Sequence, residues 1–178
     1  YYRRVAAAEQ LRLRLYERVL RVDGEDENFT VVTEKGAYRT RKVVVATGFF
    51  DIPNRLNVPG EDLPKVIHYY KEPFPYIGQK VAVIGGRNSA AKAALDCYRH
   101  GAEVTLIHRG PALSDKIKYW IRPDIENRIR EGSIRAFFNT QVLEIRPDSL
   151  LIETPDGRLE LENNWVLAMT GYRPDLEF

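Results

Sequence analysis

The strongest constraint on the fold is the stretch 80–109, KVAVIGGRNSAAKAALDCYRHGAEVTLIHR. It begins with a β-branched apolar run at residues 81–84, which is short and ends at two glycines, as is typical of a buried parallel strand. Small and apolar residues then recur every three or four positions over residues 88–99, which predicts a helix with one face on the sheet. A second apolar strand follows at residues 104–107. This order predicts the first βαβ unit of a dinucleotide-binding domain.

Composition narrows the class of protein. Of 178 residues 44% are apolar, and the formal net charge is only +2, so nothing indicates nucleic acid or an anionic membrane as a partner. The longest apolar runs fall far short of the ~20 residues of a membrane-spanning helix. The one cysteine excludes an internal disulfide, and no metal site is expected. We therefore expect a soluble cytoplasmic protein, which could form a homo-oligomer. Because the only methionine is Met169, Tyr1 is not expected to be the translation start.

The residues before the βαβ unit predict a helix followed by a β-meander. Residues 1–9 are typical of the end of a helix, and residues 11–15 alternate like a half-exposed strand. Short β-type runs separated by turn residues follow. A fully apolar strand is predicted next, before Thr47 and Gly48. In order, these runs are residues 19–22, 29–33, 37–40 and 43–46.

The same order of elements returns near the C-terminus, which indicates an internal repeat. Residues 134–145 mirror residues 11–22 at a constant offset of 123. The turn 154–157 matches the turn 33–36, and each copy ends in an apolar run followed by Thr-Gly and an aromatic residue. Chance similarity between two meanders is the alternative explanation, but the aligned spacing favours duplication.

A duplication predicts that one domain is inserted into the other. The expected fold is α/β: a Rossmann-like nucleotide domain, with a parallel sheet, helices and a meander, inserted into part of a second domain of the same kind. The predicted boundaries are 1–52 for the partial domain, 53–77 for a proline-rich connector, 78–171 for the inserted domain and 172–178 for the return connector.

Several phrases of the sequence resemble one superfamily of flavoproteins, in which an NADPH domain is inserted into an FAD domain through two linkers. The Ala46-Thr47-Gly48 segment resembles its linker, and the turn 85–90 resembles its NADPH turn. The chain is most similar to the thioredoxin-reductase-like branch of the pyridine nucleotide-disulfide oxidoreductases that includes the bacillithiol disulfide reductases. The phrases are VVVATGFFDIPNRLNVPGEDLPKV, IGGRNSAAKAALDCYRHGAEVTLIHRG, KYWIRPDIENRI and TGYRPD.

The resemblance implies two cofactors, NADPH and FAD. It also implies that the FAD pyrophosphate turn and a second flavin-contacting segment lie outside these 178 residues, so the chain is expected to be a fragment that is inactive alone. On the flavin side it implies contacts from Val19, Ala46, Thr47 and Gly48. On the NADPH side it adds Thr170 and Gly171 at the end of the last strand.

A phosphate turn works because backbone N–H groups and the positive end of a helix face the pyrophosphate, while glycine allows close approach. In a G-x-G-x-x-G/A pattern the middle glycine is replaced by Arg87, whose side chain either points away from the ligand or contacts the phosphates. Asn88 and Ser89 are expected to cap the helix and to donate to phosphate. The alternative is a tight turn in a domain without a ligand. The predicted pyrophosphate residues are Gly85, Gly86, Arg87, Asn88, Ser89 and Ala90.

The second strand ends in His108 and Arg109 instead of an acidic residue. An acid there would bind the ribose 2′-hydroxyl of NAD, whereas an arginine accommodates the 2′-phosphate of NADP. Lys116 and Lys118 follow and could add positive charge, although a solvated basic loop is the alternative. The sequence therefore predicts a preference for NADPH.

Three further residues are interpreted as structural. Thioredoxin reductases of this architecture carry a C-x-x-C before the NADPH turn, and it is absent here, so Cys97 is expected to be a packing residue. His68, in the connector, is the best remaining polar candidate but is more often structural. Trp120 shares a predicted helical face with Ile117 and Ile121, which favours core packing over nucleic-acid binding.

The leading functional hypothesis is a flavoprotein that passes hydride from NADPH to FAD and on to a disulfide, such as that of a low-molecular-weight thiol, or to a small-protein acceptor. A flavin monooxygenase and a ferredoxin-NADP reductase are the alternatives of the same fold. The monooxygenase fingerprint F-x-G-x-x-x-H fails, since Asp62 and Pro64 stand at its first two positions. The non-enzymatic alternative is an isolated nucleotide-binding module.

Overall fold

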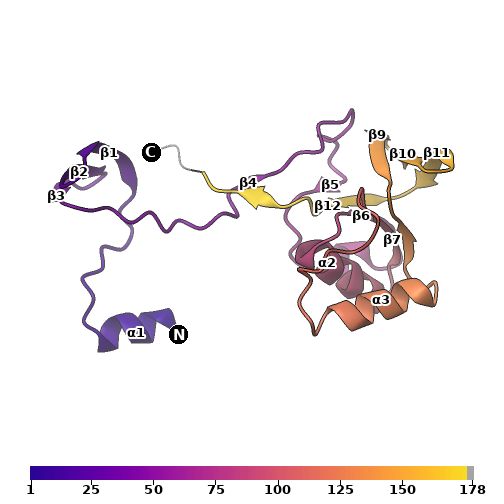
Figure 1. Cartoon of the computed structure of the whole chain (residues 1–178), viewed down its shortest axis with the longest axis horizontal. Coiled ribbons are helices and arrows are strands. Elements are labelled where there is room, and N and C mark those ends of the chain that lie inside the picture. The colour runs from indigo at the N-terminus through magenta and orange to yellow at the C-terminus, as the bar shows by residue number, and fades with distance from the viewer. Residues whose placement is uncertain (176–178) are drawn as a thin grey trace. The chain divides into compact units, whose positions relative to one another are not determined.

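The chain consists of two compact units in a computed structural model (Figure 1), which describes residues 1–175. Among the described residues, unit 1 contains residues 1–48 and 174–175, and unit 2 is Phe49–Arg173. Among residues 1–175 we find neither a helix long and apolar enough to cross a membrane nor a metal-binding group of His, Cys, Asp and Glu side chains.

Unit 2 is built around a five-stranded parallel sheet, which confirms the α/β fold class. The strand order is β5-β12-β6-β7-β8. Every neighbouring pair in this sheet is parallel, as expected for strands joined by crossover connections. The strands are β5 (Val66–Ile67), β6 (Lys80–Ile84), β7 (Glu103–Ile107), β8 (Arg135–Phe137) and β12 (Trp165–Ala168).

Two different layers cover the faces of this sheet. One face packs against α2 (Asn88–Arg99) and α3 (Arg122–Arg130), and the other against the antiparallel meander of β9 (Gln141–Ile145), β10 (Ser149–Thr154) and β11 (Gly157–Glu162). In β6, Val81 and Val83 join the core on the helical side, whereas Ala82 and Ile84 join the core on the meander side. This alternation is the period of two expected for a strand buried on both faces.

The first of the two helices, α2, forms where the sequence predicts it. α2 covers the predicted residues 88–99, and its alanine-rich face lies fully buried in the helical-side core. α3 carries Pro123 in its first turn and Asp124 near its positive end, and its last turn holds basic residues. Ile125 is the one α3 side chain that is completely buried.

The connector and the residue before it contain three short elements. These are β4 (Ile52–Pro53), β5 and the 3-10 helix η1 (Phe74–Tyr76). β4 pairs antiparallel with β13 (Tyr172–Arg173), so the segments before and after the central part of unit 2 form a two-stranded ribbon. The ring of Tyr172 stacks on Tyr69, with centroids 5.1 Å apart.

Unit 1 holds α1 (Tyr2–Ala8) and an antiparallel sheet of β1 (Val19–Glu25), β2 (Asn28–Thr33) and β3 (Ala37–Thr40). This sheet has the same order as the meander of unit 2, and the matched turns share hydrogen bonds. The hydroxyl of Thr33 donates to the carbonyl oxygen of Gly36 at 3.0 Å, and that of Thr154 donates to Gly157 at 2.9 Å. The turns therefore match in geometry as well as in sequence, which supports the repeat.

Two strands predicted in unit 1 are absent from the described structure. Residues 11–15 and 43–46 form no strand, and Val44 is 88% exposed. At an offset of 123, residues 12–14 correspond to β8, which pairs with β7 in unit 2. Within residues 1–48 the one sheet is β1-β2-β3, so neither segment has a parallel neighbour there to complete its hydrogen bonds.

The predicted helical face at residues 117–121 is also wrong, because residues 115–121 form turns before α3 begins. Ile117 is buried, at 4% exposure, and Ile121 packs on the same core. Trp120 is 61% exposed and packs edge to face against Tyr119. The core-packing interpretation therefore holds for the two isoleucines and fails for the tryptophan.

Candidate nucleotide-binding site

The glycine turn after β6 is tightly built. Gly85 has a φ of +141°, and a Cβ atom there would lie 2.5 Å from the carbonyl oxygen of Met169 and 3.1 Å from the Cβ of Ala90. Its N–H donates to the carbonyl oxygen of Ile107 at 2.9 Å. Only glycine fits this position, since any side chain would be strained and would clash with backbone. The turn therefore brings the ends of β6, β7 and β12 together.

Gly86 lies against the histidine that follows β7. A Cβ on Gly86 would lie 2.5 Å from Nε2 of His108, so the imidazole ring occupies the space that a side chain would need. The backbone N–H of His108 donates to Phe137 at 2.8 Å, and the ring meets Phe138 edge to face. The glycine turn and the end of β7 thus form one surface.

The electrostatics of this surface are cationic. Burial lowers the pKa of His108, and the nearby charges of Arg109 and Arg87 lower it further, so the imidazole is neutral near pH 7. Both arginines are exposed at the surface. Arg87 is the N-cap residue of α2, where the helix presents its positive end. Two guanidinium groups and a helix N-terminus together favour an anionic ligand.

Asn88 does not do what the sequence predicts. The side chains at the start of α2 make no capping hydrogen bond, and the amide of Asn88 turns instead to the loop after β7. Its Nδ2 donates to the carbonyl oxygen of Lys116 at 2.9 Å, and its Oδ1 accepts from the N–H of Lys118 at 2.8 Å. The capping prediction is wrong because this loop supplies backbone partners that the sequence does not reveal. Ser89 is half-buried, and its expected cap is also absent.

The end of β12 completes this edge of the sheet. The N–H of Met169 donates to the carbonyl oxygen of Ile84 at 2.8 Å, which places Thr170 and Gly171 beside the glycine turn. The hydroxyl of Thr170 donates to the carbonyl oxygen of Asn54, and the N–H of Asn54 donates to Gly171 at 2.9 Å. These two residues therefore also fasten the connectors to each other.

The structure brings the predicted NADPH residues together within unit 2, at the carboxyl ends of β6, β7 and β12. The carboxyl ends of the strands are where open α/β sheets bind their ligands. The predicted flavin contacts belong to unit 1, where Val19 begins β1 and residues 46–48 are exposed. These four residues alone do not make up a flavin site, because they supply no phosphate turn.

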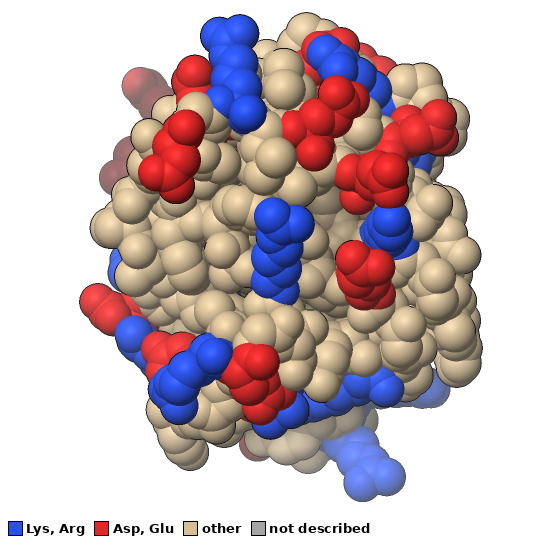
Figure 2. All heavy atoms as spheres, turned by 90° about the vertical axis from the view of Figure 1, so that its right-hand side faces the viewer, with Lys and Arg blue, Asp and Glu red and all other residues tan. Residues whose placement is uncertain are grey.

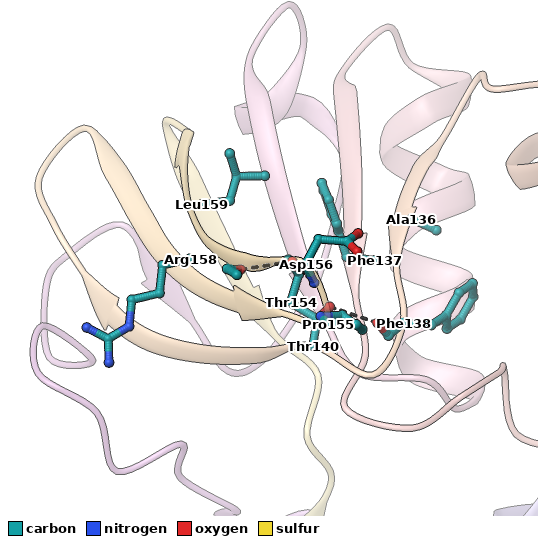
Figure 3. Close-up of a pocket in the computed structure, with 10 residues that line it drawn as sticks. Ala136, Phe137, Phe138, Thr140, Thr154, Pro155, Asp156, Arg158 and Leu159 are labelled. Atoms are coloured by element: carbon teal, nitrogen blue, oxygen red, sulfur yellow. Dashed lines mark hydrogen bonds between the residues drawn. The ribbon is translucent and has the colours of Figure 1, made fainter.

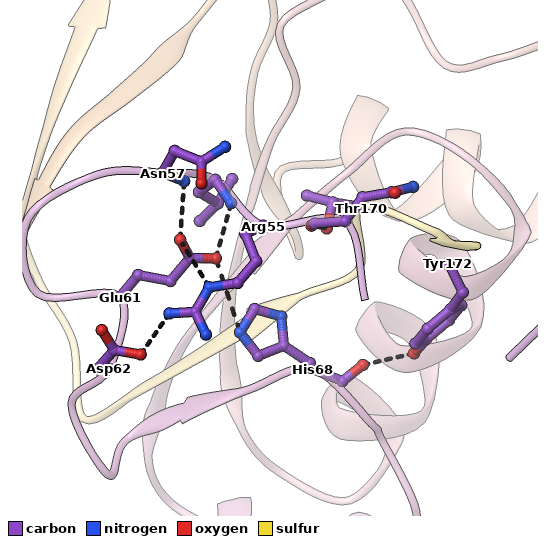
Figure 4. A network of polar contacts seen from close by, with 9 residues as sticks. Arg55, Asn57, Glu61, Asp62, His68, Thr170 and Tyr172 are labelled. Atoms are coloured by element: carbon purple, nitrogen blue, oxygen red, sulfur yellow. Dashed lines mark hydrogen bonds and ion pairs between the residues drawn. The ribbon is translucent and has the colours of Figure 1, made fainter. Parts of the chain in front are cut away.

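A polar network in the connector was missed by sequence reasoning (Figure 4). The carboxylate of Glu61 is buried and accepts hydrogen bonds from the N–H groups of Leu56 and Asn57, both at 2.7 Å. It also forms an ion pair with Nε of Arg55 at 3.5 Å, and Nε2 of His68 lies 3.7 Å from it. The prediction that His68 is structural is supported by this setting, in which burial lowers its pKa. No local pattern distinguishes Glu61 from the exposed acids around it.

Cys97 is buried with no exposed surface, and burial raises the pKa of its thiol to about 11. Its neighbour Asp96 accepts a hydrogen bond from the hydroxyl of Tyr70 at 2.7 Å. A buried, protonated thiol is a poor nucleophile, so the expected packing role fits.

A separate cavity of about 430 Å³ lies between the end of β8 and the β10–β11 turn (Figure 3). Its threonine hydroxyls are already used, since Thr140 donates to Phe138 at 2.8 Å and Thr154 donates to Gly157 at 2.9 Å. The side chain of Arg158 points away from it in Figure 3. These lining groups stabilise turns, so we assign no ligand to this cavity. On the face shown in Figure 2, acidic and basic side chains are interspersed, as expected from the small net charge.

Comparison with known proteins agrees with this geometry. Bacilliredoxin reductase Bdr of Bacillus subtilis (strain 168) is 43% identical over 155 residues, which are 86% of this chain and 48% of that protein. A ferredoxin–NADP reductase of Ignicoccus hospitalis is 32% identical over 170 residues, covering 91% of this chain and 54% of that protein. The solved structure of bacillithiol disulfide reductase Bdr (YpdA) from Staphylococcus aureus matches with a TM-score of 0.90 and 42% identity, over 100% of this chain and 55% of that one.

The chain spans about half the length of the curated relatives it matches. The model of the pyridine nucleotide-disulphide oxidoreductases matches residues 1–178. Together with the βαβ unit and the glycine turn, this match establishes that the chain belongs to the pyridine nucleotide-disulphide oxidoreductase family.

Proposed function

We propose that unit 2 binds NADPH for an FAD-dependent oxidoreductase whose acceptor is a disulfide of a small thiol. The observation that carries the proposal is the surface formed by Gly85, Gly86 and His108, with Arg109 directly after β7. A dinucleotide needs a close backbone approach at its pyrophosphate, and the 2′-phosphate of NADPH needs a cation at the end of the second strand.

The residues present fit the nucleotide. The turn at Gly85 leaves no room for a side chain, and the N-terminus of α2 faces the same edge of the sheet. Arg87 and Arg109 would neutralise phosphate groups. The ring of His108, which its lowered pKa keeps neutral, lies against Gly86. Arginine suits this task because its planar guanidinium binds phosphate through two hydrogen bonds.

The cofactors would carry the redox chemistry, and the protein would position them. NADPH supplies a hydride when bound, and the overall reaction balances as NADPH, one proton and a disulfide giving NADP⁺ and two thiols. This chain has no dithiol for a relay, since Cys97 is its one cysteine. The choice of a small-thiol disulfide rests on the Bdr relatives from Bacillus and Staphylococcus. Cytoplasmic location and a homo-oligomeric state stay predictions.

A ferredoxin–NADP reductase is the second candidate, because the Ignicoccus protein of that name matches 91% of this chain. It would use the same NADPH surface and would pass electrons singly to an iron–sulfur protein. The flavin monooxygenase alternative is disfavoured by His68, which is held by Glu61 in the connector and lacks its fingerprint partners.

The test uses the protein expressed from its complete gene. We expect bound FAD with visible flavin bands that bleach when NADPH is added without oxygen, and that recover when bacillithiol disulfide is added. Recovery with ferredoxin and not with the disulfide would favour the second candidate. Rapid NADPH-driven hydrogen peroxide release with neither acceptor would favour a monooxygenase-like reaction. Protein without flavin that consumes no NADPH would contradict the proposal and favour a binding module.

A further inference from the structure

The loop that follows β7 is fastened to the glycine turn and the start of α2 by three hydrogen bonds. The N–H of Ser114 donates to the carbonyl oxygen of Gly86 at 2.9 Å. The amide of Asn88 makes the other two, donating to Lys116 and accepting from Lys118, at 2.9 and 2.8 Å. Asn88 lies in the first turn of α2, so one side chain joins the helix start to this loop.

The loop presents two cations to solvent in a defined way. Ile117 is buried in the helical-side core, whereas its neighbours Lys116 and Lys118 are exposed. A buried residue between two exposed ones fixes which side of the loop faces water. The ammonium group of Lys118 also lies 5.1 Å from the ring centre of Trp120, within the range of a cation–π contact.

The amide of Asn88 is therefore committed to the loop backbone. Its oxygen and one of its N–H groups hold Lys118 and Lys116 in place, and neither is directed to a ligand. A residue that contacted the pyrophosphate would affect NAD and NADP equally, because both contain that group. A residue that positions lysines beside the 2′-phosphate would affect NADP alone.

We propose that Asn88 is a positioning residue for NADP selectivity: its amide holds the 114–118 loop against the glycine turn, so that Lys116 and Lys118 reinforce Arg109 at the 2′-phosphate. This inference rests on the proposed function and deepens it. The preference for NADP then depends on Arg109, Lys116 and Lys118, and on Asn88, which acts by holding the backbone of the two lysines.

The test measures the dissociation constants of NADP⁺ and NAD⁺ by calorimetry at low salt, using the protein expressed from its complete gene and its Asn88→Ala variant. Alanine is a good helix former, so α2 is expected to persist. We expect NADP⁺ to bind about five- to tenfold more weakly, as for the loss of well-placed surface charge, and NAD⁺ binding to be unchanged. Asn127→Ala is the matched control, since Asn127 is an exposed asparagine of α3.

A double-mutant cycle separates positioning from direct contact. In a background in which Lys116 and Lys118 are both alanine, Asn88→Ala should have no further effect on NADP⁺ binding. The double lysine variant, in which the clamp formed by the hydrogen bonds of the Asn88 amide to the loop is intact, should already lose the same NADP⁺-specific affinity. Hydrogen exchange gives an independent readout, because the amide of Lys118 should exchange faster in Asn88→Ala.

Three outcomes decide the matter. An equal weakening of NADP⁺ and NAD⁺ would overturn the inference and show a pyrophosphate contact. An unchanged NADP⁺ constant with a faster-exchanging Lys118 amide would overturn it too, leaving a structural clamp. A wild-type chain that binds neither nucleotide would contradict the proposed function itself, which distinguishes the two failures.

Discussion

Gly85 shows how one residue fixes the site. Its φ of +141° and the 2.5 Å approach of a built Cβ to the Met169 carbonyl oxygen leave no room for a side chain. We predict that Gly85→Ala lowers the free energy of unfolding of unit 2 by about 2–4 kcal/mol, through backbone strain and a backbone clash. Urea unfolding followed by tryptophan fluorescence checks this, since Trp120 and Trp165 both belong to unit 2.

Gly101→Ala is the control for this prediction. Gly101 also has a positive φ, of +86°, but a Cβ there would meet nothing within 4 Å. In this variant the free energy of unfolding should fall by only about 1 kcal/mol, because alanine is strained in the left-handed conformation. Equal losses in the two variants would show that the approach of Met169 does not constrain the turn.

Cys97 yields a second prediction at the residue scale. Its thiol is fully buried and its pKa is raised to about 11, so little thiolate forms near pH 8. The native chain should therefore react with Ellman's reagent at least about 100-fold more slowly at pH 8 than the same chain in guanidinium chloride. Rapid labelling of the native thiol would instead mean an accessible, activated cysteine and would revive a redox role.

At the scale of elements, the connector network predicts how stability depends on pH. Burial lowers the pKa of His68 in the fold, so below its unfolded value of about 6.5 the unfolded chain binds more protons than the folded one. Stability is thus complete above pH 6.5 and falls as the pH drops below it. His108 contributes in the same direction. Urea midpoints between pH 7.5 and 5 measure the effect.

His68→Gln separates the two histidines in this experiment. The variant should show a shallower loss of stability on acidification, because of these two histidines His108 alone then contributes a lowered pKa. If the wild-type and variant slopes coincide, His68 is not held neutral by the fold and its place beside Glu61 needs another explanation.

The elements also show what a sequence can predict. β6, α2 and β7 were predicted almost residue for residue, because a buried strand and an amphipathic helix carry their period in the local sequence. Residues 11–15 and 43–46 carry the same apolar signal and form no strand, because a parallel strand also needs a neighbour. The local sequence shows whether a segment is apolar, but it does not show whether a neighbouring strand is present.

In the candidate site, too, only the features with a local sequence signal could be predicted. The glycine turn and Arg109 were recognisable from spacing and charge, and the structure brings them to one edge of the sheet. The clamp by Asn88, the ring of His108 against Gly86 and the buried Glu61 depend on segments that are distant in the chain. Such contacts leave no periodic trace in the sequence, so they could not be predicted.

At the scale of the whole molecule, the two units differ in their burial. Residues 1–48 include no residue classed as buried, whereas unit 2 has a buried core on each face of its sheet. A small sheet without a core is marginally stable. We predict that, in the 178-residue chain, the amides of β1–β3 exchange with deuterium within seconds, while those of β6, β7 and β12 are protected by at least about a thousandfold.

Hydrogen exchange with mass spectrometry measures both units in one experiment. Added NADP⁺ should increase protection in the segments around Gly85 and Arg109, and should leave β1–β3 unchanged. Protection of β1–β3 equal to that of β6 would contradict the prediction, since it would require a core for unit 1.

The central claim is that unit 2 is an NADP-selective site with its selectivity at the end of β7. The most direct test is calorimetric titration of the 178-residue chain and its Arg109→Glu variant with NADP⁺ and NAD⁺. The wild-type chain should bind NADP⁺ at least about tenfold more tightly than NAD⁺, and the variant should lose this preference, because a carboxylate repels the 2′-phosphate and accepts from the ribose hydroxyl. Equal affinities of the wild-type chain for the two nucleotides, or an unchanged ratio in the variant, would contradict the claim.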